Sequence, residues 1–223
     1  VYNGYTNTEV FESKTYMSCI SLSHNFKKGQ LIKLGVSFSG NGSDFKYTES
    51  KEDIGYEYVA VDNLKNNAIR VTADYSKKFN AKSTLKIGGV TSFLNYDLLT
   101  ATKIDGEDNI DVSEKGNGTM FQFYLQEKYR FSSKFMGVIG IHSTYFSINK
   151  DVSIEPRIGL EWNLFPKHSL SFGFGIHSRK MPLNQYFVSL DNGTSTPNTS
   201  LDLMRANHYI LGYDWRIIKN GHL

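Results

Sequence analysis

The sequence predicts an all-β protein, an antiparallel up-and-down transmembrane β-barrel, of which this chain supplies about nine strands. Two observations favour this fold class: strand-length segments alternate apolar with polar or glycine residues, and short turns alternate with long connections. Because successive side chains of a strand point to opposite faces, each segment has one apolar and one polar face. No run of roughly 18 apolar residues exists, so the sequence predicts no transmembrane helix.

The clearest alternation lies in residues 153–176, SIEPRIGLEWNLFPKHSLSFGFGI. A tight turn at residues 165–168 divides this stretch into two strands. The apolar face of the first strand holds Ile154, Pro156, Ile158, Leu160, Trp162 and Leu164, and its polar or glycine face holds Glu155, Arg157, Gly159, Glu161 and Asn163. In a barrel whose outside meets lipid, the first face would lie outward and the second toward the water-filled lumen.

The same pattern predicts the other strands, each about ten residues long and able to cross a bilayer at a steep tilt. In chain order they span residues 16–26, 31–39, 68–79, 85–95, 119–131, 135–146 and, after the pair described above, 208–217. Three long connections are expected at residues 40–67, at about 96–118 and at 177–207. Aromatic residues gather near both strand ends, as in the belts that anchor a barrel at its two interfaces.

Two residues on the outward face do not fit it easily. A charge such as Glu127 is costly at the midplane of a bilayer, so we expect it near a rim. Pro156 cannot donate a backbone hydrogen bond, and this suits a strand end.

The predicted strand number indicates an incomplete barrel. Single-chain bacterial barrels normally have an even number of strands, and an open sheet would leave its edge groups unsatisfied in lipid. We therefore expect residues 1–223 to form part of a larger barrel. The main structural alternative is a complete small barrel of about eight or ten strands.

Composition excludes several functional classes. The net charge of +3 comes without a basic block, which argues against a nucleic-acid partner. Cys19 is the only cysteine, so neither an intrachain disulfide nor a Cys-based metal cage is possible. The histidines match no compact metal-ligand motif, although His177 and His208 flank one long connection and could approach each other. No catalytic motif is present, and we expect a protein that is not an enzyme and needs no cofactor.

Two groups of residues are candidate contacts. Glu155, Arg157 and Glu161 share one water-facing strip; the alternative is that a wide lumen is simply polar. The third long connection joins aromatic, amide and cationic side chains that suit a sugar or chelate ligand; the alternative is a solvated segment that packs on its neighbours. The candidate ligand-binding residues there are Arg179, Lys180, Asn184, Gln185, Tyr186 and Phe187.

From residue 119 onward the sequence resembles TonB-dependent outer-membrane receptors of the Bacteroidetes type. Three stretches, at residues 121–149, 153–187 and 203–217, give this resemblance. Within them, EPR-G-L-W is followed by KHSLSFGFG-H, then PL-YF, then HY-LGYDW. These motifs span about half of the chain; elsewhere only the barrel pattern is shared.

The resemblance implies a barrel of about twenty-two strands filled by an N-terminal plug domain that residues 1–223 do not include. It also implies import of a bulky nutrient (a siderophore complex, glycan, peptide or cobalamin) across the outer membrane. Partners would be outer-membrane lipid and a TonB-type energy-transducing protein, with a surface lipoprotein as a further candidate. Glu155, Arg157 and Glu161 would then face the plug. The functional alternative is a small barrel whose long loops bind a partner at the cell surface.

Overall fold

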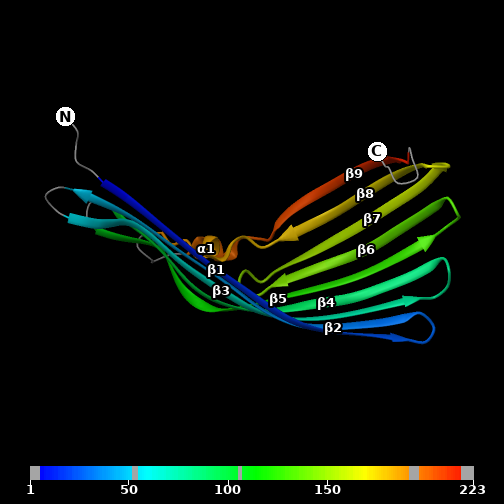
Figure 1. Ribbon diagram of the computed structural model, residues 1–223, viewed down its shortest axis with the longest axis horizontal. Helices are drawn as coiled ribbons and strands as arrows, with labels where there is room; N and C mark the ends of the chain where they lie inside the picture. Colours follow the sequence, from blue (N-terminus) through cyan, green and yellow to red (C-terminus); the bar gives the residue numbers. More distant parts are fainter. Residues whose placement is uncertain (1–5, 52–54, 105–106, 191–195, 217–223) are drawn as a thin grey trace.

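Nine antiparallel strands form one sheet in strictly sequential order, β1 to β9 (Figure 1). The computed structural model describes residues 6–51, 55–104, 107–190 and 196–216. The strands are β1 (Thr6–Phe26), β2 (Gln30–Lys51), β3 (Gly55–Lys78), β4 (Ser83–Ile104), β5 (Glu107–Arg130), β6 (Phe135–Phe146), β7 (Asp151–Phe165), β8 (His168–Arg179) and β9 (Met204–Trp215). The predicted fold class, part of an up-and-down barrel, is confirmed.

Two predicted long loops are strands instead. Residues 40–67 belong mostly to β2 and β3, and residues 96–118 belong mostly to β4 and β5. These strands have 22 to 24 residues, about twice what a bilayer requires. Their distal halves lack an apolar face, as expected for strands that continue beyond a bilayer and meet water on both sides, so the alternation disappears while the backbone pairing continues. β1 is extended in the same way.

The faces of the sheet follow the predicted alternation. Large apolar side chains on the outward face are exposed, as for Ile139 with 65% of its surface accessible. The register places Phe38 beside Ile69, and Ile69 beside Phe93, in a row across three strands. A second group of aromatics, Tyr129, Phe131 and Phe135, is in ring contact near the short turns. About ten residues separate the two levels, which at the usual tilt gives an apolar band of roughly 25 Å.

Both exceptions on the outward face have a local explanation. Glu127 accepts a hydrogen bond from Ser83 Oγ at 2.9 Å, close to the turn that follows β5. Pro156 lies inside β7 and not at its end, which corrects the prediction. However, the β7–β8 ladder stops at the adjacent Arg157, so the missing N–H of the proline falls just outside that ladder.

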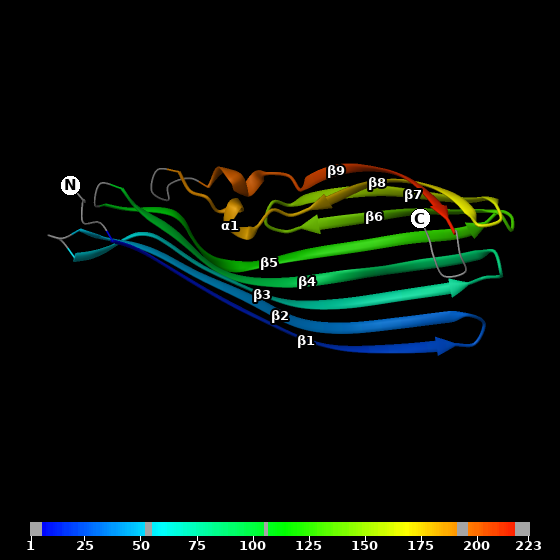
Figure 2. The same cartoon turned by 45° about the horizontal axis from the view of Figure 1, so that its top comes forward.

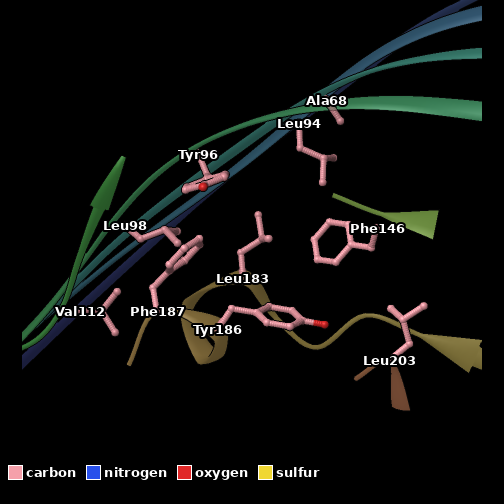
Figure 3. Packing of buried hydrophobic residues seen from close by; sticks show 10 residues of the cluster. All are labelled: Ala68, Leu94, Tyr96, Leu98, Val112, Phe146, Leu183, Tyr186, Phe187 and Leu203. Atoms are coloured by element: carbon pink, nitrogen blue, oxygen red, sulfur yellow. The ribbon is translucent and has the colours of Figure 1, made fainter. Parts of the chain in front are cut away.

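In the third predicted connection the described residues stay mostly irregular, and they fold onto the inner side of the curved sheet (Figure 2). It holds the short helices α1 (Leu183–Tyr186) and η1 (Pro197–Ser200). Its Leu183, Tyr186, Phe187 and Leu203 pack against inward residues of β3 to β6. Figure 3 shows this core, whose wall side consists of Ala68, Leu94, Tyr96, Leu98, Val112 and Phe146.

The sheet is open in the part of the chain that the structure describes. There, β1 pairs only with β2, and β9 pairs only with β8. Within the same residues no helix is long and apolar enough to cross a membrane.

Candidate functional site on the inner face of the sheet

Glu155 is the centre of a buried polar network on the inner face. Only 1% of its surface is accessible. Its Oε2 accepts a hydrogen bond from Arg157 Nη2 at 2.8 Å and lies 3.0 Å from His142 Nδ1. Its Oε1 accepts hydrogen bonds from Ser153 Oγ at 2.8 Å and from Ser178 Oγ. A buried carboxylate with hydroxyl donors on one oxygen and a guanidinium donor on the other is well satisfied.

This network lies where the β7–β8 ladder ends. Beyond Arg157 and Gly175 no backbone pairing between these strands is present in the described residues. Ser178 Oγ of β8 instead lies within hydrogen-bond distance of Ser153 Oγ, at 2.7 Å, and of Glu155 Oε1. Side-chain hydrogen bonds therefore replace backbone pairing between β7 and β8 where the chain leaves β8. The residues that follow, 180–190 and 196–203, form the inward-folded segment in the described chain.

The predicted strip of three charged residues is only partly assembled. Glu155 and Arg157 form an ion pair, and 43% of the Arg157 side chain remains accessible on the inner face. Glu161 lies further along β7, opposite Met136 and Ser171, and no hydrogen bond or ion pair within the described chain joins it to the other two. The structure thus shows one charged pair and one separate carboxylate.

The six predicted loop residues divide into two groups. Tyr186 and Phe187 are buried in the core, where Phe187 stacks on Tyr96 with ring centroids 5.1 Å apart. Burial raises the pKa of the Tyr186 hydroxyl, although this oxygen also accepts a hydrogen bond from Met181 N. Arg179 and Gln185 are exposed, and Lys180 and Asn184 are half-buried. Only these last four remain accessible as candidate ligand contacts.

Several contacts fix the inward-folded segment. Asp151 Oδ2 accepts a hydrogen bond from Leu203 N at 2.8 Å, and Asn149 Nδ2 donates to Leu201 O at 2.8 Å. At the other end, Ser189 N donates to Asp111 O on β5 at 2.7 Å. These hydrogen bonds hold the inward-folded segment to residues at the start of β7 on one side and to β5 on the other.

Lys180 and Asn184 line a pocket of ≈ 360 Å³ between this segment and strands β2 to β4. Arg70 of β3 lines the same pocket and donates from Nη1 to Ser39 Oγ at 2.6 Å. The pKa of the Lys180 ammonium is lowered by burial first and by the nearby Arg70 guanidinium second. Arg70 is a candidate site residue that the alternation pattern did not identify. The alternation of its strand places Arg70 on the polar face, but nothing in the sequence indicates that Arg70 lies near Lys180.

The two histidines that flank the inward-folded segment do meet. The ring centroids of His177 and His208 lie 4.6 Å apart. Among the described residues, no group of three or more His, Cys, Asp or Glu side chains is placed to hold a metal ion.

A family model described as "TonB dependent receptor-like, beta-barrel" matches residues 2–221. A solved structure of a mutant ferric enterobactin receptor (PfeA) from Pseudomonas aeruginosa is similar, with a TM-score of 0.44 and 12% sequence identity. That match covers 93% of this chain and 41% of the solved chain. No curated protein sequence matched.

Proposed function

The chain belongs to the TonB dependent receptor-like, beta-barrel family, and from this membership we propose that it forms part of the wall of a TonB-dependent transporter in the bacterial outer membrane. The observation that carries the proposal is the family match over residues 2–221. A lipid-compatible outer face and a polar inner face support it. The transported compound would be a bulky, scarce nutrient: a siderophore complex, glycan, peptide or cobalamin.

In the proposed mechanism the protein performs no covalent chemistry. Exposed residues of the extended strands, of the end of β8 and of the inward-folded segment would capture the nutrient, among them Arg179 and Gln185. A TonB-type protein would then drive a plug domain to rearrange and release it inward. Arg157, held in place by Glu155, presents its guanidinium to the lumen, where it would bind a carboxylate of the plug. Glu161 would contact the plug separately, and a surface lipoprotein would contact the long strand extensions.

Uptake measurements test the transport proposal. The source bacterium lacking this gene and its complemented strain would be grown with one limiting nutrient at a time from the four classes. We expect a growth defect with one class only, and the same defect when the TonB-type protein is inactivated. A defect that complementation corrects equally well without the TonB-type protein would contradict the proposal.

The intact mass of the protein purified from its native membrane distinguishes the proposal from the small-barrel alternative. A mass of roughly three or more times the 25.3 kDa of this chain is expected for a plugged barrel of about twenty-two strands. A mass near that of this chain would instead favour a small surface-binding barrel. Co-purification of a lipoprotein with the same sample would support the lipoprotein partner, and its repeated absence would remove that part of the proposal.

A further inference from the structure

The pocket between the inward-folded segment and strands β2 to β4 gathers positive charge without a matching carboxylate. Arg70 and Lys180 line it from opposite sides, one from the wall and one from the segment. Its lining contains no Asp or Glu, and neither cation forms an ion pair within the described part of the chain. Two like charges in a half-buried site repel each other, and a bound anion relieves that repulsion.

Polar groups beside the two cations give the pocket further capacity to form hydrogen bonds with a ligand. Arg70 uses one of its five N–H donors on Ser39 Oγ, so further donors remain for a ligand. The side-chain oxygen of Asn66, which also lines the pocket, is buried and has no hydrogen-bond partner among the described residues. A buried unpaired acceptor is costly, and a hydroxyl group of a ligand would satisfy it once the Asn66 amide turns toward the pocket. Asn184 adds an amide from α1.

The remaining lining is apolar. Leu94 and Leu183 face the polar groups from the wall and from α1. Such a surface suits the C–H face of a sugar ring, and the volume of ≈ 360 Å³ lies within the range of small-molecule sites, roughly 300–1,000 Å³. The pocket thus combines two cations, an unpaired acceptor and an apolar wall.

We propose that this pocket binds a hydroxylated carboxylate of the sugar-acid class, with its carboxylate between Arg70 and Lys180 and a hydroxyl on Asn66. This inference rests on one part of the proposed function, namely that solutes reach the lumen. Binding itself needs neither the TonB-type protein nor transport. The carboxylate could also come from the protein itself, for example from a plug side chain, and the experiment separates the two sources.

Calorimetric titration of the full-length receptor in detergent tests the proposal. The probes are galacturonate, glucose, which has hydroxyls and no charge, and acetate, which has a charge and no hydroxyls. We expect galacturonate to bind at least about tenfold more tightly than either of the others, because only galacturonate satisfies both halves of the pocket. Equal binding of glucose, or no binding of galacturonate, overturns the proposal. The second outcome is also the one expected if a carboxylate of the protein fills the pocket.

Three variants make the test specific. Arg70→Gln and Lys180→Gln should each weaken galacturonate binding about tenfold or more, since each removes a charged hydrogen-bond donor. Lys128→Gln, which removes an exposed lysine near the short turn after β5, should change it less than about twofold. Equal losses in all three variants would mean a general charge effect and overturn the site. Because Lys180 lies outside the strands, its variant remains informative if Arg70→Gln fails to fold.

The two proposals fail separately. Galacturonate binding without any nutrient uptake that depends on the TonB-type protein would keep the pocket and reject the transporter. Such uptake without galacturonate binding would keep the transporter and reject the pocket.

Discussion

Glu155 connects three parts of the inner face through one carboxylate. It holds Arg157 on its own strand, His142 on β6 and Ser178 at the end of β8. Because hydrogen bonds to a buried charge are stronger than neutral ones, this residue stabilises the start of the inward-folded segment as well as the position of the Arg157 guanidinium.

Glu155→Gln is expected to destabilise this region by about 2 kcal/mol, because the amide keeps the shape and loses the charge that the arginine and the hydroxyl groups bind. Hydrogen exchange of residues 177–190 measures the effect, and the variant should exchange faster there. Glu161→Gln is the matched control on the same strand and should leave exchange unchanged. Equal protection in the wild type and in Glu155→Gln would show that the carboxylate charge does not stabilise the segment.

The lowered pKa of Lys180 makes the stability of the folded protein depend on pH. Its pKa is lowered in the folded protein, so in the window between that lowered value and its ordinary value the unfolded chain binds more protons than the folded chain. Stability should therefore rise as the pH increases through this window. This rise in stability with pH is expected for the protein with no anion bound in the pocket.

Urea midpoints of the wild type and of Lys180→Met, measured at several pH values from neutral upward, test this dependence. The difference between the two proteins should shrink as the pH rises, and Lys128→Met controls for the general loss of a positive charge. A difference that stays constant over the whole range, or grows with pH, would refute the prediction.

At the scale of elements, the inward-folded segment is held mainly by apolar packing on the sheet. Tyr186 has no accessible surface and contacts Phe146 with ring centroids 5.5 Å apart. Tyr186→Ala should therefore cost about 3 kcal/mol or more, as for other large aromatic residues removed from a core. Tyr186→Phe removes only the acceptor for Met181 N and should cost about 1 kcal/mol.

Limited proteolysis of the segment measures both Tyr186 variants, and the alanine variant should be cut much faster than the phenylalanine variant. The exposed neighbour Gln185 provides the control, since Gln185→Ala should change the rate little. If Tyr186→Ala resisted proteolysis as the wild type does, the packing against the sheet would not be what holds the segment in place.

β5 offers a direct test of the two faces of the sheet. Leu125 and Gln126 are adjacent, near the middle of the predicted bilayer span, with opposite orientations. Leu125→Arg should cost roughly 2–4 kcal/mol, the usual penalty for arginine on the lipid face at the midplane. Gln126→Arg should be far milder because its side chain meets water. Unfolding by urea in lipid bilayers compares the two variants, and equal costs would argue against the assigned outer face.

In the molecule as a whole, the two outer edges of the sheet need backbone partners if the protein is to lie in a bilayer. The outer edges of β1 and β9 have no partner in the described chain, and unpaired backbone groups are not tolerated in lipid. Residues 1–223 expressed alone should therefore not insert as a stable monomer, whereas the full-length receptor should. Electrophoresis with and without heating distinguishes a folded barrel from an unfolded or aggregated chain. A heat-modifiable monomer of this chain would contradict the prediction and favour the small-barrel alternative.

The sequence alone predicted the fold class, the order of the strands near the membrane and the outward face, because contact with lipid imposes a period of two on the apolar residues. It failed for the strand extensions, since beyond the bilayer both faces meet water and the period disappears. Its assignment of Tyr186 and Phe187 to ligand contact stays a prediction, and both side chains are buried in the structure. Their composition suits a binding surface and a packed core equally well.

Only the tertiary structure placed Arg70 beside Lys180, joined Glu155 to Ser178 and packed Leu183, Tyr186, Phe187 and Leu203 against the inner face of the sheet. Each of these contacts links residues far apart in the chain or depends on the direction in which an irregular segment leaves its strand. Local alternation determines which side of a strand a residue faces, but the partner it meets there depends on strand register and on the curvature of the sheet.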